Sequence, residues 1–296
     1  MSFVLGIDLG GSSVKAVVVT PAGETLSTAN TDFDPALRLD WAEKIAGLVF
    51  QFSGAQGSAP AAIGLSAPGL AAKDNRSIAV MPGRLPGLEG LDWTQFLNAP
   101  RVVPVLNDAH AALLGEAWLG AARDFHHVIM LTLGTGVGGA IISDGKLLTG
   151  AFGKGGHLGH LCLDVDGTPD VCAMPGSLET AIGNYNIRER SDGRFESTHA
   201  LVAAHLAGDI EASRVWLKSV RALACAIGSF ANILDPEAVI IGGGIARSGP
   251  ALFEPLQRFL DEVEWRPGGG QVRLLPATLG DVAGAYGAAF NALKCL

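Results

Sequence analysis

The stretch VLGIDLGGSSVKAVVV, residues 4–19, consists of an apolar segment, a glycine-rich turn and a second apolar segment. A stretch of the same design, VIMLTLGTGVGGAIIS, occupies residues 128–143. Each has a polar residue two positions before its first turn glycine, Asp8 in one and Thr132 in the other. The repeat predicts two similar halves with a cleft between them, where both turns hold a polyphosphate, because glycine lets backbone amides approach phosphate closely. Taken singly, each stretch also fits an ordinary tight hairpin.

Two glycine-rich patterns point to sites that the chain does not have. GTGVGG, residues 134–139, fits the dinucleotide pattern G-x-G-x-x-G, but that pattern must lead from a strand into a helix, and here a second strand, AIIS, follows. GAFGKGG, residues 150–156, lacks the spacing of a phosphate loop and the Ser or Thr after its Lys. The sequence therefore excludes a Rossmann dehydrogenase and a P-loop enzyme.

Segments around the repeat alternate between strand and helix patterns, which predicts an α/β protein. Besides the repeat, strands are expected within 61–69, where Pro68 and Gly69 end the strand, and at 102–108; the segment 238–246 is expected to run from a strand into a glycine turn. The expected helices cover about 35–53, 109–120, 200–232 and 283–294. The last helix is rich in alanine and glycine, so it is expected to pack closely and to cross back towards the first half.

Composition narrows the function classes. The 296 residues are 48% hydrophobic and carry a net charge of -8 without a long basic run, which disfavours a nucleic-acid partner. The four cysteines have no framework spacing and indicate reduced thiols. No leader segment or apolar run of about 20 residues is evident. We expect a soluble cytoplasmic protein without a membrane partner.

Four motifs in this order resemble those of the ROK family of sugar kinases, within the actin-like ATPase superfamily: GIDLGGSSVK, VLNDAHAALLGE, LTLGTGVGGAII and DPEAVIIGGGIA. The resemblance implies an α/β fold of the duplicated actin-like ATPase (ribonuclease H-like) type, with two domains, 1–108 and 109–296, and a central cleft. The closing helix, about 283–296, would pack back towards the first domain. A homodimer is implied as well. ROK repressors have an N-terminal DNA-binding segment, but here the first strand starts at Phe3, so the resemblance is to the kinases.

The implied activity is phosphorylation of a sugar hydroxyl by ATP and Mg²⁺, by family habit the 6-hydroxyl of glucose or a relative. Asp8 would be the partner of hydrated Mg²⁺. The residues expected along the nucleotide and its phosphates are Gly10, Gly11, Ser12, Thr135, Gly136, Gly243 and Gly244. Two alternatives stay open: a non-catalytic sugar sensor on the same fold, and a kinase whose phosphate donor is polyphosphate.

Asp108 is the candidate general base. It stands where a strand ends and a helix begins, the edge at which α/β folds build their sites, and a helix N-terminus favours its ionised form. Asn107 would then bond a sugar hydroxyl beside the reacting one. The alternative is that both residues only cap the helix.

The segment 157–179 departs from the family pattern of Glu-x-Gly-His followed by Cys-x-Cys-Gly-x-x-Gly-Cys-x-Glu, in which the His and three Cys hold a structural zinc and both Glu and the His contact the sugar. His157 replaces the first Glu, whereas His160 and Glu179 are retained. The three cysteine positions hold Asp170, Cys172 and Ser177. Because structural zinc needs mostly thiolate and imidazole ligands, we expect no structural zinc. The pairs His157/His160 and His160/Cys162 have ligand-like spacing, which short clusters also show by chance.

Because of two basic residues, the sequence does not decide which sugar is the substrate. A carboxylate accepts two hydrogen bonds from neighbouring hydroxyls, whereas the imidazole of His157 accepts at most one. Arg84 stands where many ROK kinases have an Asn that touches the sugar. Two interpretations stay open: together the two residues suit an acceptor-rich, amino or acidic sugar, or Arg84 is solvated and His157 simply substitutes for Glu.

Overall fold

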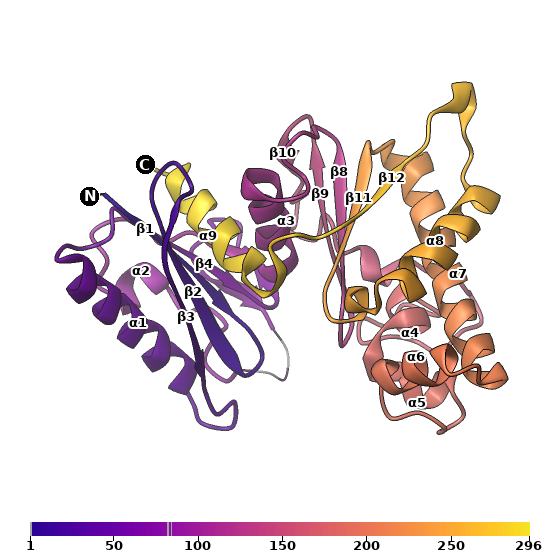
Figure 1. Ribbon diagram of the computed structural model, residues 1–296. Helices are drawn as coiled ribbons and strands as arrows, with labels where there is room; N and C mark the ends of the chain where they lie inside the picture. Colours follow the sequence, from indigo (N-terminus) through magenta and orange to yellow (C-terminus); the bar gives the residue numbers. More distant parts are fainter. Residues whose placement is uncertain (1, 82, 84) are drawn as a thin grey trace. The chain divides into compact units, whose positions relative to one another are not determined.

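The computed structural model describes residues 2–81, 83 and 85–296, so the predicted sugar contact Arg84 lies outside the described residues (Figure 1). The chain forms two compact units. The first consists of Met1–Asp124, Leu147–Gly155 and Thr278–Leu296, and the second of Phe125–Lys146 and Gly156–Ala277. This division differs from the predicted boundary at residue 108. The helix that begins there stays in the first unit, because Gly115 packs so tightly against the last helix that an added Cβ would lie 2.3 Å from the Ala283 carbonyl oxygen.

The sheet of the first unit has the strand order β3-β2-β1-β4-β7. β1 (Val4–Leu9) pairs antiparallel with β2 (Ser13–Val19), which pairs antiparallel with β3 (Thr25–Asp32). On its other side β1 pairs parallel with β4 (Ala62–Ala67), and β4 pairs parallel with β7 (Val105–Asn107). The carboxyl ends of β1, β4 and β7 therefore lie along one edge. A small hairpin, β5 (Leu70–Ala71) and β6 (Ile78–Val80), follows β4.

The sheet of the second unit repeats this plan with the order β10-β9-β8-β11-β12. β8 (Val128–Leu133) is antiparallel to β9 (Val137–Ser143) and parallel to β11 (Ala238–Gly242), which is parallel to β12 (Arg273–Pro276). The edge strand β10 is Lys146–Leu147. The predicted duplication is confirmed, with one difference in register: Asp8 lies opposite Lys15, whereas its counterpart Thr132 lies opposite Gly138.

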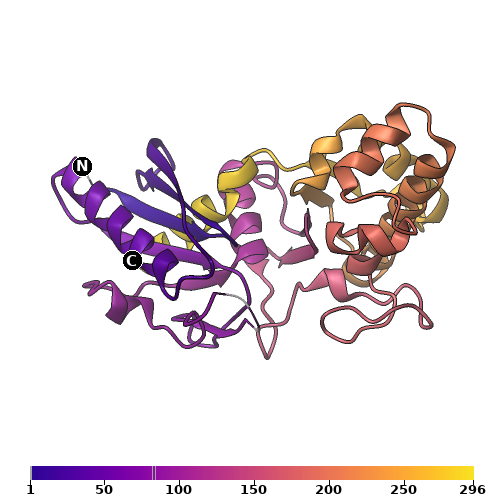
Figure 2. The same ribbon diagram turned by 90° about the horizontal axis from the view of Figure 1, so that it is seen from below.

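Helices cover both faces of the first sheet (Figures 1 and 2). α1 (Asp40–Gln56) packs on the face that carries Leu5, Ile7 and Leu9. α9 (Ala283–Leu293) packs on the face that carries Val4, Val17 and Val19. α3 (Asp108–Leu119) lies beside α9, and α2 is the short helix Trp93–Phe96. α1 begins five residues later than predicted, because Asp40 accepts a hydrogen bond from the Asp34 N–H and the intervening residues form a turn.

α9 approaches the sheet more closely than a side chain would allow. Gly6 and Gly64 are paired across β1 and β4, directly beneath the helix. An added Cβ at either position would lie 1.9 Å from a helix carbonyl oxygen, that of Ala285 or Ala288. The small residues of α9 and these two glycines together make the contact possible.

The second unit buries its sheet under α4 (Leu178–Ile182), α5 (Ile187–Arg190), α6 (Thr198–Leu206), α7 (Ile210–Leu234) and α8 (Pro250–Val263). The helix expected at 200–232 is two helices, because Gly208 has a φ of 87° and the Asp209 side chain caps α7 through the Ala212 N–H. α7 has the length and composition of a membrane span, yet Trp216, Leu223 and Ile227 on one of its faces are core residues. The 3₁₀ helices are Leu158–His160, Asn184–Asn186, Ile245–Ser248, Pro267–Gly269 and, in the first unit, Gly280–Val282.

Candidate active site

Asp8 lies near the carboxyl end of β1 within a specific set of neighbours. The buried Ser66 of β4 donates its hydroxyl to Asp8 Oδ1 at 2.7 Å. Burial raises the pKa of Asp8 to about 6; the Ser66 hydrogen bond opposes this shift, the Asp108 charge adds to it and Lys15 opposes it. An added Cβ on Gly284 of α9 would lie 2.7 Å from the Asp8 carboxyl carbon, so glycine is required there. Sequence reasoning missed Ser66 and Gly284 as neighbours of Asp8.

Asn107 and Asp108 both accept a hydrogen bond from the Ala109 N–H at the start of α3, Asp108 through its Oδ1 at 2.8 Å. The Asn107 Oδ1 accepts hydrogen bonds from the Ala109 and His110 N–H groups at 3.0 and 3.4 Å, so Asn107 is the N-cap. Its Nδ2 donates to the Gly69 carbonyl at 2.9 Å. One N–H of the Asn107 amide is left for a ligand. Asp108 is exposed in the first turn of the helix, near enough to Asp8 to raise its pKa.

The turn between β1 and β2 is tight and open to the outside. The Gly10 N–H donates to the Ser13 carbonyl at 2.9 Å, and the Ser12 carbonyl accepts from the Phe33 N–H at 3.0 Å. An added Cβ on Gly11 would meet no described atom within 4 Å, and Gly11 is absent from the positive-φ residues. The fold itself gives no reason for glycine at this position.

The turn between β8 and β9 is held by the segment that begins with α4. The Gly134 and Thr135 carbonyls accept hydrogen bonds from the Asn184 and Tyr185 N–H groups at 3.0 and 2.9 Å. The Glu179 Oε2 accepts from the Val137 N–H at 2.8 Å, and an added Cβ on Gly136 would lie 2.1 Å from this oxygen. Glu179, predicted as a sugar contact, thus uses one oxygen to hold the turn. Thr135 is exposed at its tip.

The turn after β11 contacts the end of β8. Gly243 has a φ of 85°, and an added Cβ would lie 2.3 Å from the Leu133 carbonyl oxygen. Position 243 therefore requires glycine for two reasons, the positive φ and the lack of space for a side chain. Gly244, like Gly11, has no described atom within 4 Å of an added Cβ. Thr135, Gly136, Gly243 and Gly244 thus all belong to turns at the carboxyl edge of the second sheet.

His157, which comes just before the 3₁₀ helix Leu158–His160, lies in a stretch that runs against β9. An added Cβ on Gly139 would lie 2.5 Å from the Gly156 carbonyl oxygen, and one on Gly159 would lie 2.0 Å from the Val137 carbonyl oxygen. The structure therefore brings the predicted sugar contacts His157, His160 and Glu179 to the same end of β9.

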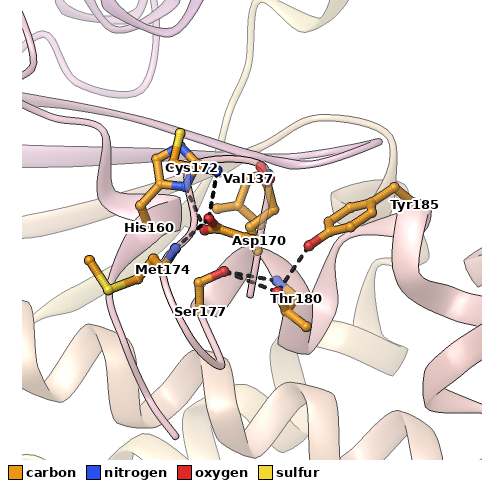
Figure 3. Close-up of polar contacts among 9 residues, drawn as sticks. Val137, His160, Asp170, Cys172, Met174, Ser177, Thr180 and Tyr185 are labelled. Atoms are coloured by element: carbon orange, nitrogen blue, oxygen red, sulfur yellow. Dashed lines mark hydrogen bonds and ion pairs between the residues drawn. The ribbon is translucent and has the colours of Figure 1, made fainter. Parts of the chain in front are cut away.

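His160, Asp170 and Cys172 form a cluster whose potential metal-binding atoms lie within 4.8 Å of one another (Figure 3). The His160 Nδ1 lies 2.7 Å from the buried Asp170 Oδ2, and its Nε2 lies 3.5 Å from the Cys172 Sγ. The Asp170 Oδ1 accepts from the Cys172 and Met174 N–H groups at 2.8 and 3.0 Å. Burial opposes ionisation of Asp170, but hydrogen bonds from His160, Ser177 and these two amides together hold its pKa below the usual value.

This cluster does not fit a tetrahedral zinc. The Asp170 carboxylate occupies the Nδ1 of His160 and already accepts two backbone hydrogen bonds. Ser177, at the fourth position, is a neutral hydroxyl that caps α4 through the Thr180 N–H at 3.3 Å. Zinc at the His160 Nε2 and the Cys172 Sγ would gain one imidazole and a single thiolate, and Asp170 could become a third ligand only at the cost of hydrogen bonds that it already accepts. The Ser177, Thr180 and Tyr185 hydroxyls instead form a chain, with distances of 3.2 and 2.9 Å, that reaches the residue holding the Thr135 carbonyl (Figure 3).

The sequence profile of the ROK family matches residues 4–294. The chain belongs to the ROK family. Among ROK-type relatives, the glucokinase of Thermotoga maritima is 31% identical over 97% of this chain and 96% of its own length. The ROK hexokinase of Thermus thermophilus has a TM-score of 0.85 at 31% identity, covering 99% of this chain and 98% of that one. A ROK family glucokinase from Streptomyces griseus, solved with glucose and AMPPNP, has a TM-score of 0.78 at 27% identity, covering 99% and 100%.

These matches confirm the predicted fold and the sugar kinase class for this ROK-family chain. The residues predicted for the site are divided between the units. Asp8, Gly10, Gly11, Ser12, Asn107 and Asp108 belong to the first unit, and Thr135, Gly136, His157, His160, Glu179, Gly243 and Gly244 belong to the second.

Proposed function

We propose that the chain transfers the γ-phosphate of ATP to a sugar hydroxyl, with Asp108 as general base. The observation that carries this proposal is the pair of carboxylates at one sheet edge: Asp108 follows β7, Asp8 lies near the end of β1, and the charge of Asp108 raises the pKa of Asp8. Phosphoryl transfer needs a positioned hydroxyl, an acceptor for its proton and neutralisation of phosphate charge. Asp108 is exposed and therefore accessible to a sugar hydroxyl.

Asp8 fits a hydrated Mg²⁺. A single carboxylate, ionised at neutral pH and fixed by Ser66, matches the preference of Mg²⁺ for few protein ligands and retained waters. When bound, Mg²⁺ neutralises phosphate charge. The open glycine turns and the exposed Ser12 and Thr135 supply N–H and hydroxyl donors for phosphate oxygens.

For the sugar, we propose a hexose phosphorylated at its 6-hydroxyl, with His157 deciding which hexoses are accepted. The imidazole in place of a carboxylate weakens recognition of a neutral diol and tolerates an amino or acidic sugar. A cytoplasmic homodimer without nucleic-acid or membrane partners remains a prediction from the sequence.

The substrate experiment measures ADP release with ATP across glucose, amino sugars and sugar acids, for the native protein and His157→Glu. We expect His157→Glu to raise kcat/KM for glucose relative to the acidic sugars by about 10-fold, the effect of roughly one hydrogen bond. The exposed His199 of α6 provides the matched control, His199→Glu. An unchanged ratio would remove His157 from specificity. If no sugar causes ADP release although sugars still bind, a sensor is favoured. If only polyphosphate supports phosphorylation, the phosphate donor is polyphosphate and not ATP.

We further propose that the segment 160–177 is held without zinc. Dialysis against a strong zinc chelator is expected to leave the thermal unfolding midpoint unchanged. Asp170→Ala is expected to lower the free energy of unfolding by about 2–4 kcal/mol, because it removes a buried ionised acceptor of several hydrogen bonds. Asp166→Ala, in an exposed part of the same segment, is the control. One equivalent of zinc by elemental analysis, together with a lower midpoint after chelation, would contradict this.

A further inference from the structure

Arg190, the last residue of α5, donates hydrogen bonds to carbonyl groups at the C-terminal end of α4. Its Nη1 donates to the Ala181 carbonyl at 3.0 Å and to the Ser219 Oγ at 2.5 Å. Its Nη2 donates to the Gly183 carbonyl at 2.9 Å and, more weakly, to the Ile182 carbonyl at 3.3 Å. None of these four acceptors is a carboxylate. Burial lowers the pKa of Arg190 to about 10, so the guanidinium stays charged at neutral pH and its hydrogen bonds are charge-assisted.

The carbonyls held by Arg190 immediately precede the residues that hold the β8–β9 turn. Asn184 and Tyr185 follow Gly183 directly, and their N–H groups bond the Gly134 and Thr135 carbonyls. The contact is close at Gly183 as well, where an added Cβ would lie 3.0 Å from the Thr135 carbonyl oxygen. A shift of the α4 end would therefore move both carbonyl contacts of the turn.

The Gly134 and Thr135 carbonyls share their peptide groups with the N–H groups of Thr135 and Gly136, and these N–H groups are the donors proposed to bind phosphate. Within the described part of the chain, the N–H groups of Thr135 and Gly136 donate to no main-chain carbonyl, and Thr135 is exposed. Because the carbonyls are fixed on the α4 side, the planar peptide groups are fixed too, and the direction of their N–H groups is set. Preorganised donors hold an anion better than donors that must first be ordered.

We propose that Arg190 is a positioning residue for the phosphates of ATP: it fixes the end of α4, whose following amides set the direction of the N–H groups in the Gly134–Gly136 turn. This inference rests on the proposed phosphate-binding function of that turn. The planar fork of arginine suits the task, because it reaches several carbonyls at once in fixed geometry, which a lysine ammonium on a flexible stem does not reproduce.

The experiment uses Arg190→Lys, which keeps the charge and loses the fork, and Ser219→Ala, which leaves the arginine in place and removes one of its partners. Arg188→Ala is the matched control, because Arg188 lies on the same short helix but pairs at the surface with Glu196. For Arg190→Lys we expect the KM for ATP to rise about 10-fold, while the KM for the sugar changes less than 2-fold, as for the loss of one to two well-directed hydrogen bonds. Ser219→Ala should show a smaller change in the same direction.

The affinities for adenosine and for a non-hydrolysable ATP analogue, measured by calorimetry, distinguish a positioning role of Arg190 from a general loss of structure. Arg190→Lys should lower the affinity for the ATP analogue and leave the affinity for adenosine unchanged. Equal losses for adenosine, the analogue and sugar, or a folded Arg190→Lys protein with native affinity for ATP, would overturn the proposal. Thr135→Pro removes the Thr135 N–H and so tests the turn directly. If it weakens binding of the analogue while Arg190→Lys does not, only the role of Arg190 fails; if a folded Thr135→Pro protein also binds the analogue with native affinity, the phosphate role of the turn fails.

Discussion

Asp108→Asn is expected to lower kcat for sugar phosphorylation by about 10²–10⁴-fold, the range over which a positioned general base contributes. The amide keeps the size of the side chain and its place in the first turn of α3, but it cannot accept the hydroxyl proton. ATP affinity should survive. Initial rates at saturating ATP and sugar, with nucleotide binding measured separately by calorimetry, give the comparison, and Asp124→Asn, an exposed position in the same unit, is the control.

The same variant has a second expected effect that is independent of turnover. Because the Asp108 charge raises the pKa of Asp8, removing that charge should lower the Asp8 pKa. NMR titration of the Asp8 carboxyl carbon in native and variant protein measures this directly. Near-native turnover would refute Asp108 as the base, and an unchanged Asp8 titration would show that the two carboxylates do not interact.

Asp8→Asn is expected to lower activity strongly and yet to stabilise the fold. Without the carboxylate, the site loses its partner for hydrated Mg²⁺, and kcat should fall by about 10² or more, as when a preorganised electrostatic contact is removed. The stability effect follows from the pKa of about 6, against an ordinary value of 3.8. The folded protein binds this proton more tightly than the unfolded chain, so the contribution of Asp8 to stability falls as pH rises from about 4 to 6.

Above pH 6 the ionised carboxylate destabilises the fold, by on the order of 1–3 kcal/mol from a shift of this size. Asp8→Asn should therefore unfold at higher denaturant than the native protein at pH 7–8, and the difference should vanish near pH 4. Ser66→Ala, which removes the hydroxyl that favours the ionised form, should act oppositely at pH 7. A less stable Asp8→Asn protein at pH 7 would show that the carboxylate is not under strain from burial.

The duplicated sheet was predictable because its signal is local. An apolar strand, a glycine turn and a second strand lie within one short stretch, and the copies at 4–19 and 128–143 form the matching hairpins. The break in the helix expected at 200–232 also had a local signal, because Gly208 and Asp209 are a stop and a cap. The late start of α1 depends on a hydrogen bond between Asp34 and Asp40 that periodicity does not reveal.

The neighbours of the site were beyond sequence reasoning because they are tertiary. Ser66 and Gly284 matter only through Asp8, and both are far from it in the chain. The sequence did not distinguish Asn107 from Asp108 as the cap; in the structure Asn107 is the N-cap of α3, and the exposed Asp108 also accepts a hydrogen bond from the Ala109 N–H. In the sequence, Asp170 is evident only as a replacement for a cysteine of the family pattern. In the structure, its carboxylate contacts the His160 ring and accepts hydrogen bonds from two backbone N–H groups.

The fit of α9 over Gly6 and Gly64 has a consequence for how the protein is made. The ribosome synthesises β1 at the start and α9 tens of seconds later, at about 5–20 residues per second. During that interval, the β-sheet face that carries Val4 and Val17 has no covering helix, and Asp8 lacks the backbone that will lie against it. One face of the first sheet therefore stays uncovered until translation has passed α9.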